Sequence, residues 1–548
     1  MKKIYLIIFL IFLPYLSWAA CTSDEGSPAT WTCSGATQEE VQTAVTAASA
    51  GDTIIFPSSG SATWASGVTV GKALTINGNG TTLTSSGSLA DGFFYLYNFS
   101  STSLMRITKF IFQMNGAGRG IYSASVALAQ LRIDNNTFHH GTTQMEITGA
   151  KGVIDNNYFY NSIGYSVVYS AGTRAQADAS WESMAAGTSD ALFIENNHFI
   201  KDANFLGSTY GTDIDTNNGG KLVIRYNTWD STNSPASILA TIYPIQLHGN
   251  ACGGCDSVNE AYWENDSTAR RGQSVVEIYN NTMAGRRIDR LATLRGSAAL
   301  IHDNAITGTV AYNPIIYFYE EEYTLTSQFS PARTAWPAED QTHNTFTWNN
   351  TYKGADFNAG TYGSVAWSPD TSAGLQKDRD IFLHAPCGAS DTTDGYGNTC
   401  THGKATFTDS NGGSASYPTD GDTYPTKGNM VFTETGDNAY LGYSAYTYPH
   451  PLRTEEEDPS IEFSVTVTGA GVTSSHSGTH SVLTGGSVNL VFTRYNGWNG
   501  VLAGYDSAAC GAATCSQPTE GGSVTCTIAP VSAGCTVTYT ATAKNLLN

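Results

Sequence analysis

Five short segments carry side chains that can move protons or hold charge. They are Glu146–Gly149, Val167–Ser170, Asp213–Thr216, Gln246–Gly249 and Thr293–Gly296. Alternation of aliphatic and other residues is typical of β-strands with one buried face. We therefore predict that the residues facing a core are Ile147, Val168, Ile214, Leu247 and Leu294.

The neighbours of these aliphatic residues are expected to point outward and form a column of reactive groups. The predicted column contains Thr148, Tyr169, Asp215, His248, Arg295 and, on a sixth strand at Ile316–Tyr319, either Tyr317 or Tyr319. A second outward column beside it holds Glu146, Asp213, Gln246 and Thr293. Strands stacked about 4.8 Å apart would place Asp215, His248 and Arg295 within about 10 Å of one another. The alternative interpretation is an ordinary solvated sheet face.

These residue types match the needs of β-elimination on a uronate sugar, in which a carboxylate is neutralised, a ring proton removed and a leaving oxygen protonated. Arg295 is predicted to neutralise the carboxylate and His248 to act as base, although the two roles can be exchanged. Tyr169 or Tyr317 is the predicted acid. Asp213 and Asp215 are expected either to bind Ca²⁺, which prefers oxygen ligands, or to orient His248.

Long insertions are expected after three of these strands, at about 171–190, 250–273 and 320–345. Their aromatic residues are predicted either to stack on sugars, as for Trp263, or to pack the loops; they are Trp181, Tyr262, Trp263, Tyr323 and Trp336. A basic stretch overlaps them, and its arginines are Arg270, Arg271, Arg286, Arg287, Arg290 and Arg295. We expect Arg270, Arg271, Arg286 and Arg287 to bind an anionic substrate together with Gln246 and Tyr317, or to pair with acidic loops.

A repeated six-residue phrase indicates how these strands are held. It occurs in forms such as Ile133–Phe138 and Ile154–Phe159, and its fourth residue is always asparagine. These asparagines are Asn136, Asn157, Asn197, Asn227, Asn281, Asn304 and Asn350. A period of about 22 residues, rich in β-branched residues, favours a coil of stacked strands. The asparagines are predicted to adopt left-handed bends and to bond to one another along the stack.

The start of the coil is predicted to be a capping helix. Thr37 and Glu40 form a capping-box pattern, Val41 and Val45 share one helical face, and Gly51 follows before a first strand at Thr53–Phe56. Such a helix would cover strand edges that are otherwise unpaired. The predicted fold class is all-β: a right-handed parallel β-helix over residues 21–453, then a small antiparallel β-sandwich-like domain.

The two ends of the chain have distinct patterns. Residues 1–20 have a basic start, an apolar run and small residues before Cys21, which is typical of a secretory signal peptide; lipidation of Cys21 is the alternative. Residues 454–460 are a polar linker, and residues 461–548 have the period-two alternation of an Ig-like β-domain. The ten cysteines lie in close groups, as expected of local disulfides. They are Cys21, Cys33, Cys252, Cys255, Cys387, Cys400, Cys510, Cys515, Cys526 and Cys535.

Composition narrows the function classes. The 548 residues are 41% hydrophobic and only 14% charged, with a formal charge of −20. This balance excludes a coiled coil and opposes general binding to nucleic acids or to anionic membrane surfaces. Motifs for nucleotide, haem or flavin cofactors are not evident.

Several motifs together resemble a known family. They are Gly220–Thr228, His248-Gly249, Glu277–Thr282, Arg295-Gly296 and the Tyr-Pro-His-Pro-Leu segment ending at Leu452. Over about residues 35–452 the chain resembles secreted bacterial right-handed parallel β-helix proteins of the pectate-lyase-like superfamily. The tail is similar to Cys-bearing β-domains of bacterial surface proteins, which implies a role in attachment. The superfamily includes lyases, hydrolases, epimerases and adhesins, so the resemblance implies fold rather than activity.

The predicted outward column and the basic stretch favour activity, so the leading hypothesis is a secreted lyase that cleaves an acidic polysaccharide. One alternative is a glycoside hydrolase that uses Asp213 or Asp215 with a carboxylate such as Glu146. The other is a non-catalytic adhesin or glycan-binding protein on the bacterial surface.

Overall fold

The structure is a computed structural model that divides into two compact units, Met1–Tyr446 and Thr447–Asn548. In the first unit it describes residues 21–115, 118–170, 186–205, 212–217, 221–234, 243–247, 273–295, 297–311, 315–319, 344–356, 365–367, 381–388, 390–401, 406–408, 414–416, 440 and 442–446. In the second unit it describes residues 447–453 and the strands given below.

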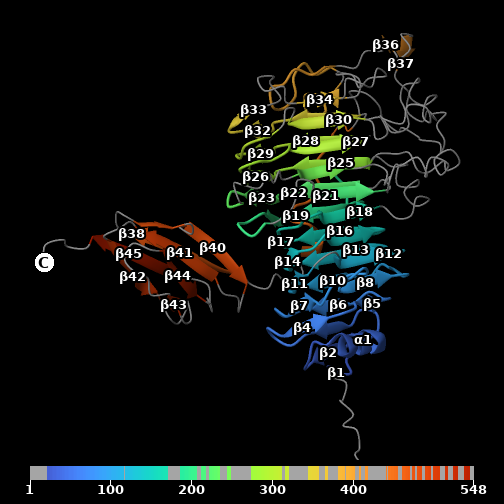
Figure 1. Ribbon diagram of the computed structural model, residues 1–548. Coiled ribbons are helices and arrows are strands. Elements are labelled where there is room, and N and C mark those ends of the chain that lie inside the picture. The colour runs from blue at the N-terminus through green and yellow to red at the C-terminus, as the bar shows by residue number, and fades with distance from the viewer. Residues whose placement is uncertain are drawn as a thin grey trace, which may run out of the picture. The chain divides into compact units, whose positions relative to one another are not determined.

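Three long sheets build the first unit (Figure 1). Sheet 1 has 14 strands. In spatial order they are β1 (Cys21–Ser23), β2 (Thr30–Cys33), β3 (Thr53–Ile55), β6 (Thr75–Asn77), β10 (Met105–Thr108), β13 (Ala127–Asp134), β16 (Ala150–Asp155), β19 (Leu192–Glu195), β22 (Lys221–Arg225), β25 (Gln273–Tyr279), β28 (Ser297–His302), β31 (Thr345–Trp348) and β35 (Ile381–Phe382), with β9 (Ser100–Ser101) paired to β13.

Sheets 2 and 3 have 11 and 10 strands. Sheet 2 contains β4 (Ser61–Trp64), β7 (Thr82–Ser85), β11 (Ile111–Met114), β14 (Thr137–His140), β17 (Tyr158–Tyr160), β20 (His198–Ile200), β23 (Thr228–Ser231), β26 (Thr282–Gly285), β29 (Ala305–Ile306), β32 (Thr351–Tyr352) and β33 (Ala355–Asp356). Sheet 3 contains β5 (Val68–Val70), β8 (Phe94–Tyr97), β12 (Arg119–Ala124), β15 (Thr143–Thr148), β18 (Tyr165–Ser170), β21 (Thr212–Asn217), β24 (Tyr243–Leu247), β27 (Ala292–Arg295), β30 (Ile316–Tyr319) and β34 (Val365–Trp367). A separate hairpin joins β36 (Thr406–Thr408) to β37 (Ser414–Ser416).

The chain visits the three sheets in turn, so each circuit adds one strand to each sheet. For example, β13, β14 and β15 are followed by β16, β17 and β18, and each pairs in parallel with its predecessor one circuit earlier. This arrangement confirms the predicted stacking of parallel strands and is consistent with a parallel β-helix. Strands far apart in sequence therefore become neighbours.

Stacked side chains of one type fill the core. On sheet 1 the inward column runs from Ile76 through Ile107, Ile133, Ile154, Ile194, Ile224, Ile278 and Ile301, all fully buried. On sheet 2 the rings of Phe112, Phe138, Phe159, Phe199 and Trp229 stack in the same way. Each circuit thus buries its apolar residues against the next, as expected of a solenoid.

The asparagine ladder is confirmed and continuous. Each side-chain amide donates to the side-chain oxygen of the next asparagine, at 2.8–3.1 Å from Asn136 to Asn350. The predicted left-handed conformation is wrong by one position. It belongs to the preceding residue, as in Asn156 (φ 55°) and Asn280 (φ 55°). This bend turns the side chain of the following asparagine inward. There its amide hydrogen-bonds backbone groups that have no backbone partner at the bend.

The capping helix is also confirmed. Helix α1 spans Gln38–Ala47, with both hydrogen bonds of the capping box between Thr37 and Glu40. Val41 and Val45 are buried, and Gly51 takes a positive φ of 92° before β3. The helix packs beside β1, β2 and β5 at the first circuit. Within the described part of the chain, none of the helices has the length and hydropathy of a membrane span.

Two of the predicted local disulfides are present, Cys21–Cys33 and Cys387–Cys400. The sulfur of Cys21 is bonded to that of Cys33. Residues 1–20 and the pair Cys252/Cys255 lie outside the described residues.

The second unit contains two four-stranded sheets. One orders β40 (Gly478–Leu483), β38 (Ser460–Thr468), β45 (Thr536–Ala543) and β42 (Trp498–Tyr505); the other orders β39 (Val472–Ser474), β41 (Val488–Arg494), β44 (Ser523–Ile528) and β43 (Ala513–Cys515). A 3₁₀ turn at Pro451–Arg453 precedes them. Most pairs are antiparallel as predicted, but β38 and β45 run parallel, which corrects the prediction for these two strands.

Candidate functional site

The outer face of sheet 3 carries one column of side chains from eight successive strands, here called the outer column. Its members, in order, are Tyr95, Tyr122, Glu146, Val168, Asp215, Gln246, Thr293 and Tyr317. The strands of sheet 3 lie along one side of the coil in Figure 1. The predicted neighbours Gln246 and Thr293 are therefore brought together. Tyr317 was predicted for the other column but pairs with Thr293, whereas the alternative Tyr319 pairs with Arg295.

The predicted position of Tyr169 is wrong. The backbone of Tyr169 pairs with Ile147 and with Thr216, so its side chain belongs to the inward column and is only 4% exposed. Burial raises the pKa of its phenol far above the ordinary range. Val168, predicted to be inward, belongs to the outer column instead. A slip of one residue exchanges the two faces of a strand, and three consecutive apolar residues at 167–169 leave its alternation ambiguous.

The two aspartates of β21 lie two positions from their predicted register. Asp215 was predicted to share a column with His248 and Arg295. It lies instead in the outer column with Gln246, and it is 4% exposed. Its Oδ1 accepts a hydrogen bond from the backbone N–H of Thr216 at 2.7 Å. Asp215 is thus a buried carboxylate directly below the half-buried Gln246.

Asp213 forms a buried ion pair. Its Oδ1 lies 2.9 Å from Lys201 Nζ and accepts a hydrogen bond from the Ser166 hydroxyl at 3.0 Å. Calcium ions take six to eight oxygen ligands. A lysine ammonium already neutralises this carboxylate, so the described contacts of Asp213 are those of a structural ion pair. Calcium binding by Asp213 and Asp215 stays a prediction.

The end of the outer column has a polar cluster. Gln246 Oε1 accepts a hydrogen bond from the Thr212 hydroxyl at 3.2 Å, and the Arg290 guanidinium carbon lies 5.1 Å from the centre of the Tyr317 ring. Arg290 also pairs with Asp289 at 3.0 Å. Burial raises the pKa of Asp289, although Arg290 and Arg287 oppose the shift. The phenol of Tyr317 and the amide of Gln246 thus lie in this part of the column, with the guanidinium of Arg290 beside Tyr317.

Two other predicted arginines have described contacts. Arg286 is exposed and its Nε donates to the carbonyl of Thr232 at 3.0 Å, while Arg287 is half-buried and acts on Asp289. Arg295 ends β27, and its backbone pairs with that of Tyr319. The predicted residues His248, Trp263, Arg270 and Arg271 lie outside the described residues, as do Trp181, Tyr262, Tyr323 and Trp336.

An aromatic cluster that was not predicted lies at the opposite end of the outer column. Tyr95 stacks on Tyr97 with ring centres 5.1 Å apart and on Tyr122 at 5.2 Å. The guanidinium carbon of Arg119 lies 4.4 Å from the centre of the Tyr122 ring, and Arg119 pairs with Glu146. The signal was the alternation of tyrosines in Phe94–Tyr97, which places both on one face of a strand.

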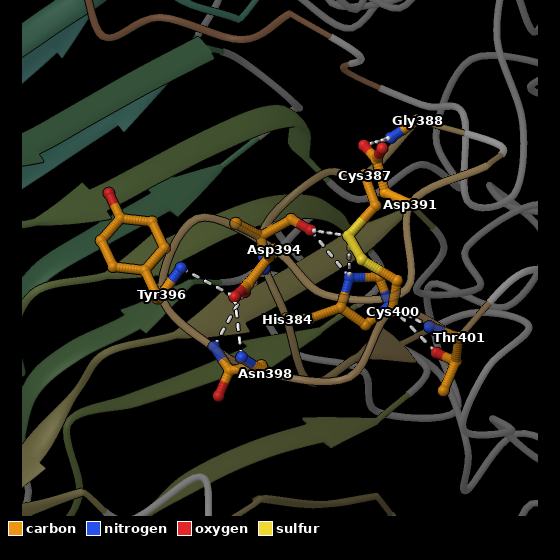
Figure 2. Close-up of a disulfide and its surroundings, with 10 residues drawn as sticks. His384, Cys387, Gly388, Asp391, Asp394, Tyr396, Asn398, Cys400 and Thr401 are labelled. Atoms are coloured by element: carbon orange, nitrogen blue, oxygen red, sulfur yellow. Dashed lines mark hydrogen bonds between the residues drawn. A yellow bond between two sulfur atoms is a disulfide. The ribbon is translucent and has the colours of Figure 1, made fainter.

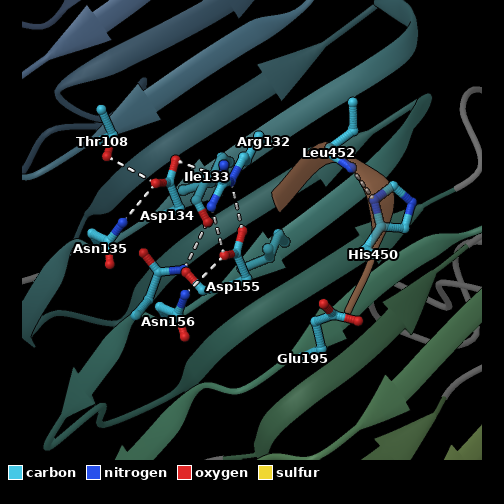
Figure 3. A network of polar contacts seen from close by, with 12 residues as sticks. Thr108, Arg132, Ile133, Asp134, Asn135, Asp155, Asn156, Glu195, His450 and Leu452 are labelled. Carbon is cyan, nitrogen blue, oxygen red and sulfur yellow. Dashed lines mark hydrogen bonds and ion pairs between the residues drawn. The ribbon is translucent and has the colours of Figure 1, made fainter. Parts of the chain in front are cut away.

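A second group of charges lies on sheet 1 and is structural (Figure 3). Arg132 forms two hydrogen bonds to Asp155, both at 3.1 Å, and Asp134 accepts from Thr108 and from Arg106. All but Arg106 are nearly fully buried. Buried charges of this kind are stable only when paired. The charges of this network pair with one another, so their presence is explained without a ligand.

The side chains of His384, Cys387 and Cys400 have the types and proximity of metal ligands (Figure 2). The two sulfurs are joined in a disulfide, and the two ring nitrogens of His384 contact Ala385 O at 2.7 Å and Thr401 Oγ1 at 3.0 Å. Metals bind thiolates, which a disulfide does not offer. Asp394 supports the same loop by accepting from the backbone N–H of Ala385 at 2.8 Å. This cluster is a loop staple.

Comparisons with protein-family models, with curated proteins and with solved structures find no match to this chain. The geometry of the outer column is therefore the basis for assigning a function.

Proposed function

We propose that the chain is a secreted, right-handed parallel β-helix protein that binds an acidic polysaccharide on the outer face of sheet 3. The observation that carries the proposal is that the half-buried Gln246 and Tyr317 share one column of sheet 3 and that Arg290 lies beside Tyr317. Asp215 and Thr293 belong to the same column but are buried. A polymer of repeating sugars suits a surface built from repeating strands, because equivalent side-chain positions recur about every 4.8 Å.

The chemistry of the cluster supports a sugar ligand. Gln246 and Tyr317 are half-buried and present an amide and a phenol, which hydrogen-bond sugar hydroxyls. Tyrosine also offers a ring face on which the apolar side of a sugar packs. Arg290 and Arg287 supply positive charge in a chain with a formal charge of −20, which favours an anionic group on the ligand at this point.

Cleavage by β-elimination is the second candidate function, and the adjacency of Arg290 and Tyr317 favours it. An arginine beside a tyrosine supplies a group that neutralises a uronate carboxylate and a group that protonates the leaving oxygen. In this proposal His248 or Arg295 is the base, and Tyr317 replaces the buried Tyr169 as the acid.

The second unit is proposed to attach the protein to the bacterial surface, because residues 461–548 resemble the Cys-bearing β-domains of bacterial surface proteins. Nucleic acid is not a proposed partner, because the net charge opposes contacts to phosphates.

The test uses the full chain with pectin, alginate and glycosaminoglycans. Ultraviolet absorbance reports unsaturated products, reducing-end assays report any cleavage, and calorimetry reports binding. Binding with unsaturated product supports both candidates, and binding without cleavage supports only the first. Reducing ends without unsaturated product favour the hydrolase, and absence of binding to every acidic polymer contradicts the proposal.

Variants locate the site. Arg290→Ala and Tyr317→Phe are expected to weaken binding or turnover about tenfold or more, and raised salt is expected to weaken binding further by screening the arginines. Lys151→Ala removes an exposed cation on sheet 1 and is the matched control. Equal losses in Lys151→Ala and Arg290→Ala would place the ligand elsewhere. Full activity in both His248→Ala and Arg295→Ala would exclude both as the base.

A further inference from the structure

The stacked tyrosines at the first strands of sheet 3 are exposed, unlike the aromatic ladder inside the coil. Tyr97 is 44% exposed and Tyr95 and Tyr122 are half-buried, whereas the stacked rings of sheet 2 from Phe112 to Trp229 are fully buried. The inner ladder stabilises the fold by burial. The outer three rings contribute less to it, because they remain partly in water.

The three rings form one preorganised surface. Tyr95 contacts Tyr97 along β8 and Tyr122 on β12, and Arg119 packs on Tyr122 while its Nη1 donates to Ala90 O at 2.6 Å. Arg119 is held on its other side by Glu146. Rings fixed in this way give a large contact area at low entropic cost, which is why tyrosine is enriched in binding surfaces.

Charge indicates which part of a ligand this surface accepts. Asp91 and Glu146 both act on the hydroxyl of Tyr122, and Arg119, which pairs with Glu146, opposes them. The surroundings of the three tyrosines are therefore acidic, in contrast to the Arg290 end of the outer column. An anionic sugar would be repelled here, and an uncharged ring would not.

We propose that Tyr95, Tyr97 and Tyr122 form a second carbohydrate subsite that binds uncharged sugar rings. This inference rests on the proposed function, because the outer column continues in register from these tyrosines to the Arg290 cluster, seven strand spacings or about 34 Å away. The ligand that engages both ends is then a polysaccharide with neutral and acidic segments rather than a uniform polyuronate.

The experiment titrates the full chain separately with cellohexaose, xylohexaose and β-1,4-galactohexaose, and with a hexamer of galacturonic acid. We expect one or more neutral hexamers to bind, with tyrosine fluorescence as the signal. Tyr97→Ala is expected to weaken that binding about tenfold, and Tyr97→Phe is expected to keep it within about threefold, because the ring provides most of the contact.

The matched control is Tyr158→Ala, which removes a tyrosine of similar exposure (41%) from sheet 2. Failure of all three neutral hexamers to bind overturns the inference, as does an equal loss of binding in Tyr97→Ala and Tyr158→Ala. The acidic polymers distinguish the two proposals. If Arg290→Ala abolishes their binding and Tyr97→Ala leaves it unchanged, the proposed function stands even if this subsite does not.

Discussion

The buried asparagines show how one side chain can stabilise every circuit of the coil. The Asn281 side-chain nitrogen donates to Ile224 O at 2.8 Å, to Tyr279 O at 3.1 Å and to Asn304 Oδ1 at 2.9 Å. Its oxygen accepts from the backbone and side chain of Asn227. Buried polar groups that lose such partners are costly, so the ladder specifies where each bend lies.

We predict that Asn281→Ala lowers the free energy of unfolding by about 3 kcal/mol, because it leaves buried carbonyls and an N–H without partners. The neighbouring Asn280→Gly is the control. Residue 280 has a positive φ that glycine adopts without strain, so this change is expected to alter stability by less than about 1 kcal/mol. Urea unfolding of the first unit measures both. Equal effects would show that the ladder is not what holds the bend.

At the scale of elements, the segment 442–446 lies against sheet 1 through a buried carboxyl group. Glu277 on β25 is 2% exposed and accepts hydrogen bonds from the Tyr443 hydroxyl at 2.7 Å and the Gly187 N–H at 2.8 Å. Burial raises the pKa of Glu277, although these two donors oppose the shift. Two segments distant in sequence thus depend on hydrogen bonds to one residue.

A raised carboxyl pKa in the folded state implies a definite dependence on pH. The contribution of Glu277 to stability is fully present below the unfolded pKa of about 4.3 and decreases as the pH rises through the folded pKa. We predict that Glu277→Gln makes stability less dependent on pH above 4.3, and that its stability relative to the parent improves as the pH rises toward 8.

Chemical denaturation at several pH values gives this difference, and Glu25→Gln at an exposed position is the control. The interpretation fails if the stability difference between Glu277→Gln and the parent is constant with pH. It also fails if Glu25→Gln gives the same trend.

At the scale of the whole molecule, the chain forms two compact units that divide between Tyr446 and Thr447. Their architectures differ, since the first repeats parallel circuits and the second pairs its strands mostly antiparallel. Cooperative unfolding is a property of a compact unit with its own contacts.

We therefore predict two separate transitions in calorimetry. A chain ending at Arg453 is expected to lose one transition and to keep the other within about 2 °C, which for a unit of this size corresponds to about 2 kcal/mol. Its binding to acidic polysaccharide is also expected to be unchanged. A single transition in the full chain, or loss of binding on truncation, would contradict independent units.

Local patterns in the sequence were sufficient for much of the fold. The capping box at Thr37, the isoleucine column and the asparagine repeat each depend on neighbours in sequence or on a constant period, so they could be predicted without coordinates. The register of sheet 3 could not. Val167, Val168 and Tyr169 are all apolar, and either face is consistent with their composition.

The sequence by itself therefore determined the stacking of parallel strands, the repeat that marks the bends to within one residue and most of the residues that fill the core, because these follow from periodicity and burial. Only the tertiary structure decided which side chains share the outer face. In the structure Tyr169 points inward, Asp213 pairs with Lys201, and Tyr95 stacks on both Tyr97 and Tyr122. The physical reason is that a slip of one residue costs little in the sequence pattern, yet it moves every side chain of the strand to the opposite face.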